Sequence, residues 1–203
     1  MARMNTQATS VAALLALSVF SFACGGDAPA TTGGTTAGAA PVAAPQASGP
    51  DAVKAAAVPT PEVEAMTKAV AALGPHTQAQ YPPIPFRGYA PPRPPDIVTA
   101  AFQFAAEHPE ILSYVPCFCG CQQGGHKGNH DCFVRSRAAN GDVLEWEEHG
   151  VECAVCIDVA TRSRQMFASG ASAAEIRAAI EREFLPNAQT MTPTPKPPAA
   201  HSH

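Results

Sequence analysis

The sequence has few charged and few aromatic side chains. Charged residues make up 15% of the chain and aromatic residues 6%, and the formal net charge is −4. No basic stripe runs along the sequence, so the electrostatic surface that a nucleic-acid-binding protein needs is absent. Paired carboxylates, a nucleophile elbow and a phosphate-binding glycine loop are missing too, which argues against a conventional enzyme. We expect a non-enzymatic protein with no nucleic-acid partner, and redox activity stays open.

The N-terminal apolar run is too short to cross a membrane as a mature helix. It extends from Val11 to Phe20, after Arg3, and has the size of a signal-peptide core. Small residues precede Cys24 as they do in a bacterial lipoprotein signal, and cleavage before Cys24 would leave that thiol lipidated. We therefore expect an extracytoplasmic protein held by lipid on the cell membrane or the outer membrane. An ordinary signal peptide with a free Cys24 is the alternative.

Much of the remaining chain lacks the large apolar residues that build a core. Ala, Gly, Thr and Pro dominate after Cys24 and again at the C-terminus, where we expect His201 and His203 to be solvated. Only one segment has the size and patterning of a small domain. The predicted order is a signal peptide (1–23), a lipidated cysteine and flexible tether (24–60), a short helix and Pro-rich linker (61–94), a cysteine-rich domain (95–185) and a disordered tail (186–203).

The domain is predicted to be mainly α-helical, with about three helices. Apolar residues recur at helical spacing from Asp96 to His108, and Pro109 stops that helix. A second helix is expected over 148–168. A third begins at Ser172, where the Ser-x-x-Glu pattern is a capping box, and ends before Pro186. Asn140-Gly141 favours a short hairpin between the first two helices.

The densest chemistry lies between Pro116 and Cys132. Alternate residues place three thiols on one side of an extended backbone, and a turn at Gly120 would bring them together. The histidines that follow lie on a glycine-rich loop whose ligand geometry is adjustable. Thiolate and imidazole suit copper, zinc and similar ions. The candidate ligands in this stretch are Cys117, Cys119, Cys121, His126, His130 and Cys132.

A second group follows about twenty residues later. His149, Cys153 and Cys156 have the spacing that puts side chains on one face of a helix, and Cys153 lies near its first turn, where the dipole favours a thiolate. Ile157 occupies the position of the histidine that covalent haem attachment requires. We expect the segment around Gly120 to fold back against this helix, so that both groups share one pocket.

The hexapeptide Pro116 to Cys121 resembles the signature of a family of bacterial lipoproteins named for a Pro-Cys-Tyr-Cys-Gly-Cys motif, with Phe118 in place of the tyrosine. The resemblance implies export, lipidation and a cysteine-rich domain, and it names no ion or reaction. It continues through His126, Asn129, Asp131, Cys132, Phe133, Trp146, His149, Cys153, Cys156 and Asp158.

Three functions fit these cysteines. The first is binding of a soft transition metal, copper first and zinc second, for metal handling or structural stapling; closely spaced thiolates suit Cu(I), and the single Cys-x-x-Cys pair is fewer than a structural zinc site usually has. The second is a disulfide-stapled interaction module, in which Cys117, Cys119 and Cys121 pair with later cysteines. The third is thiol–disulfide exchange, with Cys153 as nucleophile and Cys156 as resolving thiol. The expected partners are the membrane, through Cys24, and a metal-delivery or redox protein.

Overall fold

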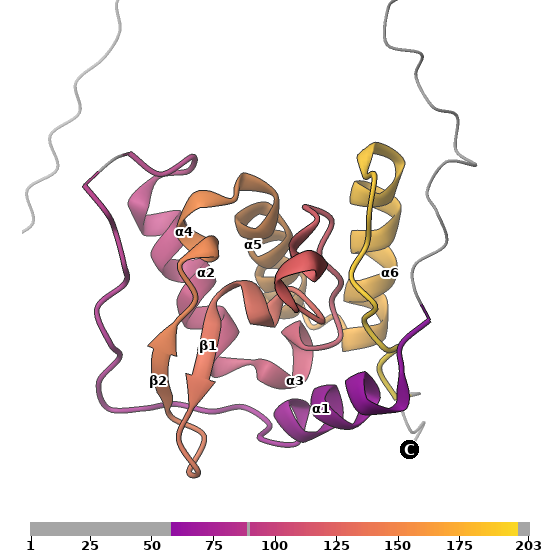
Figure 1. Cartoon of the computed structure of the whole chain (residues 1–203), viewed down its shortest axis with the longest axis horizontal. Helices are drawn as coiled ribbons and strands as arrows, with labels where there is room; N and C mark the ends of the chain where they lie inside the picture. The colour runs from indigo at the N-terminus through magenta and orange to yellow at the C-terminus, as the bar shows by residue number, and fades with distance from the viewer. Residues whose placement is uncertain (1–57, 89, 199–203) are drawn as a thin grey trace, which may run out of the picture. The chain divides into compact units, whose positions relative to one another are not determined.

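The computed structural model describes residues 58–88 and 90–198. Within these residues it contains six α-helices and one two-stranded sheet, so the prediction of a mainly α fold is confirmed. The three longest helices of the cysteine-rich part are α2 (Pro95–Glu107), α5 (Ala154–Ala168) and α6 (Ala173–Phe184). Helix α5 packs between α2 and α6 (Figure 1). The signal peptide, Cys24, His201 and His203 lie outside the described residues.

Helix α2 follows the pattern of its sequence. Pro95 lies in its first turn, where the missing backbone donor costs nothing, and Pro109 begins the short helix α3 (Pro109–Leu112) after it. Its buried face includes Phe102, whose ring meets the rings of Phe133 and Trp146 edge to face, with centroids 5.1 and 5.2 Å apart. This aromatic cluster joins α2 to the hairpin.

The predicted hairpin is present. Strands β1 (Val134–Arg137) and β2 (Val143–Trp146) pair antiparallel, with Val134 opposite Trp146 and Arg137 opposite Val143. The turn between them contains Gly141 with φ of +96°, a left-handed conformation that glycine adopts without strain. The hairpin projects away from the α5–α6 pair in Figure 1.

The third predicted helix has the predicted start. The Ser172 hydroxyl accepts the backbone N–H of Glu175, and the Glu175 carboxylate accepts the backbone N–H of Ser172, which completes the capping box of α6. The second predicted helix is divided into α4 (His149–Glu152) and α5, and the break falls at Cys153. The prediction of one continuous helix was wrong at that residue.

The segment expected to be a linker lies on the domain. Helix α1 (Pro61–Ala71) contacts α3. Farther along, the indole N–H of Trp146 donates to the carbonyl of Pro82 at 2.7 Å, and Arg93 makes two hydrogen bonds to the Asp158 carboxylate. The compact unit therefore begins before residue 95. Among the described residues, no helix combines the length and apolar character needed to cross a bilayer.

Candidate metal centre

The cysteines of the two sequence groups meet in one place. The Sγ of Cys117 lies 3.2 Å from that of Cys156, and the Sγ of Cys119 lies 3.5 Å from each of them. These atoms come from the loop after α3 and from the first turn of α5. The expected fold-back around Gly120 is confirmed, and Gly120 itself has φ of +87°, which turns the chain sharply between Cys119 and Cys121.

One compact set of ligand atoms is centred on the start of α5. The Nε2 of His149 is 3.3 Å from the Sγ of Cys119, and the Sγ of Cys156 is 3.5 Å from the same atom. Cys153 belongs to the same set, because all four ligand atoms lie within 4.8 Å of one another. Such a spacing suits three thiolates and an imidazole around one ion. The set is Cys119, His149, Cys153 and Cys156.

A second compact set lies beside the first. The Sγ atoms of Cys117, Cys121 and Cys132 are mutually within 4.8 Å, and those of Cys121 and Cys132 are 3.7 Å apart. The Nδ1 of His126 is 3.5 Å from the Sγ of Cys132. Cys121 begins the 3-10 helix η2 (Cys121–Gly124), and Cys132 ends the 3-10 helix η3 (His130–Cys132). All three sulfurs of this set are buried.

The break at Cys153 explains how α4 and α5 both reach the cysteines. Cys153 has extended backbone, with φ −102° and ψ +104°, and it precedes α5 at the N-cap position. Helical spacing therefore does not place His149 and Cys153 on one face, as the sequence suggested. A change of direction between the two helices brings them to the same group instead. The prediction that His149, Cys153 and Cys156 lie together is confirmed. The prediction that one continuous helix brings them together is wrong.

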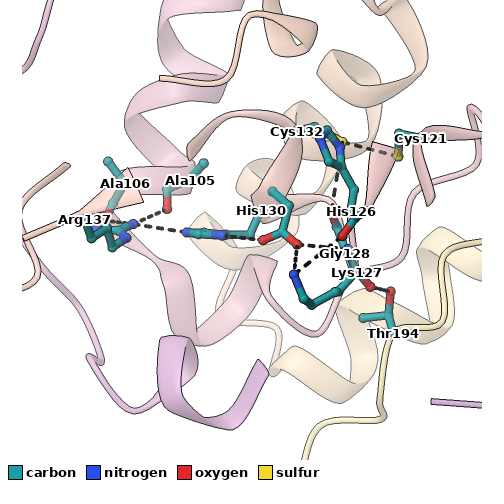
Figure 2. A network of polar contacts seen from close by, with 12 residues as sticks. Ala105, Ala106, Cys121, His126, Lys127, Gly128, His130, Cys132, Arg137 and Thr194 are labelled. Carbon is teal, nitrogen blue, oxygen red and sulfur yellow. Dashed lines mark hydrogen bonds and ion pairs between the residues drawn. The ribbon is translucent and has the colours of Figure 1, made fainter. Parts of the chain in front are cut away.

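His130 is not part of either set. Its Nδ1 is 3.2 Å from the carboxylate of Asp131, and its Nε2 is 3.2 Å from a guanidinium nitrogen of Arg137 (Figure 2). Because Arg137 can only donate, Nε2 must accept, and Nδ1 carries the proton that goes to Asp131. Arg137 also donates to the carbonyls of Ala105 and Ala106 at the end of α2. His130 therefore links η3 to α2 and β1, and its prediction as a ligand is corrected.

Substitution His130→Asn removes the contacts of the buried imidazole with Arg137 and Asp131. The free energy of unfolding should fall by about 1–2 kcal/mol, because two hydrogen bonds are lost although Arg137 keeps the carbonyls of Ala105 and Ala106. Bound metal per chain should not change, since the side chain points away from the sulfurs. Urea unfolding and metal analysis of the same preparation check both parts, and a loss of metal would return His130 to the ligand set.

The pKa values of the cysteines and of His149 are shifted in different directions. Side-chain hydrogen bonds from Cys117, then from Cys121 and Cys132, lower the pKa of Cys119. Hydrogen bonds to Cys119 and then to Cys153 raise the pKa of His149 to about 10. The contact with Cys117, followed by that with Cys119, raises the pKa of Cys156. In the metal-free state these pKa shifts favour a proton on His149 over one on Cys119, and a metal ion would displace protons from the group.

The C-terminal segment covers the cysteine loop. The backbone N–H of Cys117 donates to the Thr192 hydroxyl at 2.8 Å, and the backbone N–H of Thr192 donates to the carbonyl of Cys117 at 2.9 Å. The Thr194 hydroxyl donates to the carbonyl of Lys127. Buried Arg177 of α6 donates to the carbonyls of Thr194 and Pro195. Residues 186–198 are thus an ordered strap, and the expectation of a disordered tail is corrected for them.

The strap carries a signal that sequence analysis missed. Thr192 and Thr194 alternate with Pro193 and Pro195, whose fixed φ favours extended backbone, and alternate residues of an extended chain share a side. Both threonines are buried, with 0% and 4% of their surface exposed. Composition alone predicts a disordered tail here, because the partners of the strap lie far away in the chain.

Substitution Thr192→Val tests whether the strap supports the cysteine loop. Valine keeps the shape but leaves the Cys117 N–H without an acceptor in a buried place, so the free energy of unfolding should fall by about 1–2 kcal/mol. The metal affinity should fall as well, because the loop that holds Cys117 loosens. Thr192→Ser keeps the hydroxyl and is the matched control. Equal stability and affinity in all three proteins would show that the strap does not support the site.

A family model described as protein of unknown function with PCYCGC motif matches residues 92–197. The match contains both ligand sets and extends through the strap to residue 197, so it includes Thr192 and Thr194. No curated protein and no solved structure matches the chain. Because the match covers more than half of the chain, the chain belongs to the family of proteins with the PCYCGC motif.

Proposed function

We propose that this protein is an exported, membrane-anchored lipoprotein whose domain binds a soft transition metal through its Cys/His cluster, for metal handling or structural stapling. The observation that carries the proposal is that three sulfurs from two segments distant in sequence lie together. The Sγ atoms of Cys117, Cys119 and Cys156 lie 3.2–3.5 Å apart, and the imidazole of His149 is in contact with Cys119. No disulfide bond joins the six described cysteines.

Copper is the first candidate ion, and zinc is the second. Thiolates are soft ligands, and soft ligands select Cu(I), whereas imidazole serves either ion. Sulfurs at every second residue place several thiolates within reach of one small ion. The structure adds that the sulfurs are buried or half-buried, which protects a reduced ion from water and oxidant. Zinc would take four of the same ligands in a tetrahedral site.

The sequence supports export and anchoring. An apolar run of signal-peptide size precedes Cys24, and a tether of small residues follows it, in a part of the chain outside the described residues. A lipid on Cys24 would hold the domain outside the cytoplasm, at a distance set by the length of the tether. In that place a metal-delivery or redox protein would be the exchange partner.

A disulfide-stapled module is the second candidate, and one observation favours it. The sulfurs of Cys117 and Cys156 are 3.2 Å apart, and those of Cys121 and Cys132 are 3.7 Å apart. Both separations exceed the ~2.05 Å of an S–S bond, yet a small movement would close them in an oxidising compartment. The metal proposal is preferred because His149 and His126 also face sulfur, and a staple needs no imidazole. Thiol–disulfide exchange by Cys153 and Cys156 is a minor third candidate.

One experiment separates the candidates. The full chain is exported in a bacterial host, solubilised in mild detergent under argon, and weighed by native mass spectrometry. The proposal predicts bound copper or zinc and a diacylglyceryl mass on Cys24. After metal is stripped anaerobically, cysteine-specific alkylation and peptide mapping should find six free thiols from Cys117 to Cys156. Metal at trace level only, together with blocked thiols, would replace the metal function with the stapled module.

A further inference from the structure

The cluster contains more soft ligands than one ion can use. Seven ligand atoms form the two compact sets, and His126 adjoins the second, while a tetrahedral ion takes four ligands. We propose, building on the proposed metal function, that the protein holds a pair of thiophilic ions in two adjacent sites of one histidine and three cysteines each. The first site is Cys119, His149, Cys153 and Cys156. The second site is Cys117, Cys121, Cys132 and His126.

The first site has the dimensions of a four-ligand centre. A metal–sulfur bond of about 2.3 Å in a tetrahedron keeps sulfurs about 3.8 Å apart. The 3.5 Å between the sulfurs of Cys119 and Cys156 needs an outward shift of only a few tenths of an ångström on that geometry. His149 is already 3.3 Å from Cys119. The ligands come from the loop after α3, from α4 and from α5, so the ion would tie three segments together.

The second site is complete only with His126. Its three sulfurs come from the loop after α3 and from η2 and η3, and the 3.7 Å between Cys121 and Cys132 matches the tetrahedral spacing closely. Figure 2 shows the His126 ring beside Cys132, whose sulfur also contacts that of Cys121. The contact of its Nδ1 with Cys132, at 3.5 Å, is the counterpart of the His149 contact with Cys119 in the first site.

His126 lies at the exposed edge of the second site. Gly125, just before it, has φ of +89°, and a Cβ there would meet nothing within 4 Å, so the space beside the loop is open. His126 is half-buried and lines a cavity of about 320 Å³ together with Lys127 and Asp131. The second site therefore borders this cavity at His126, while its three cysteines are buried.

The two sites are in contact. The Sγ of Cys117, in the second site, lies 3.2 Å from Cys156 and 3.5 Å from Cys119, both in the first. The rings of His126 and His149 have centroids 5.7 Å apart. Cys117 and Cys156 are thus placed to bridge the two ions.

The number of ions bound per chain tests whether the protein holds two ions. The full chain is loaded anaerobically with Cu(I), and in parallel with Zn²⁺, and weighed by native mass spectrometry with elemental analysis. We expect two ions per chain for the wild type and one for the double variant C121S/C132S. One ion in the wild type, or two in the double variant, overturns the pair and leaves the proposed function intact. An absence of bound ions in the wild type overturns the proposed function itself.

His126→Asn provides the test that does not depend on a deeply buried substitution. The affinity for one of the two ions should fall at least tenfold, and the other ion should bind as in the wild type. His130→Asn, four residues away and held by Asp131 and Arg137, is the matched control and should keep both affinities. A His126→Asn protein with both wild-type affinities would remove His126 from the site and with it the four-ligand second centre.

Discussion

Anaerobic removal of bound metal should lower the melting temperature by roughly 10–15 °C. A ligand present at a thousand times its Kd stabilises the native state by about 4 kcal/mol, and each kcal/mol shifts the melting temperature of a chain this size by about 2–4 °C. The structural reason is that the ligands, three cysteines and His149, join the loop after α3 to α4 and α5. Scanning calorimetry of metal-loaded and chelated protein, both reduced, measures the shift.

The control for this result is the variant C119S/C156S. It lacks two sulfurs of the first set and keeps the set of Cys117, Cys121 and Cys132, so its melting temperature should be low at the start and should fall less on chelation than that of the wild type. Restoring the metal to the chelated wild type should restore the melting temperature. If verified metal loss leaves the wild-type transition unchanged, the ion does not contribute to folding, and stapling is excluded in favour of metal handling alone.

The helices with local signals were predictable from the sequence. Helix α6 begins with a capping box and α2 begins at a proline, and both signals act within one or two turns of the chain. The hairpin follows from Asn140-Gly141 in the same way. Each of these features needs no information about the rest of the molecule, and each was placed within a few residues.

The break between α4 and α5 was not predictable, because its cause is distant in sequence. Gly150 in α4 packs directly on the carbonyl of Cys132 and on the ring of Phe133, so η3 and the residue after it set the direction of α4. The spacing of residues from His149 to Cys156 gives no information about the contact of Gly150 with Cys132 and Phe133. The shared pocket was still inferred correctly, since soft ligands in two dense groups are hard to explain separately.

The roles of His130 and the strap depended on long-range partners too. His130 lies in the sequence among ligands, but Arg137 and Asp131 hold its ring. The strap has the composition of a disordered tail, but Arg177 and the backbone of Cys117 supply hydrogen bonds that composition cannot foresee. In both cases a buried donor or acceptor needed a partner, and tertiary structure provided it.

Gly150→Ala should be among the most damaging single substitutions. A Cβ at Gly150 would lie 2.6 Å from the carbonyl oxygen of Cys132, 2.6 Å from the Phe133 ring and 2.9 Å from the Phe102 ring. A backbone oxygen cannot move aside as a flexible side chain does, so α4 and η3 must separate. We expect a loss of roughly 3 kcal/mol in the free energy of unfolding. Metal occupancy should fall with it, since Cys132 lies on one side of this contact and His149 on the other.

Gly124→Ala is the matched control for this prediction. Gly124 lies in η2, close to Cys121, yet a Cβ there would meet nothing within 4 Å. Its free energy of unfolding should stay within about 0.5 kcal/mol of the wild type, with full metal occupancy. Urea unfolding followed by metal analysis compares the three proteins. If Gly150→Ala unfolds at the wild-type urea concentration and keeps its metal, close packing of α4 on η3 does not position the ligands.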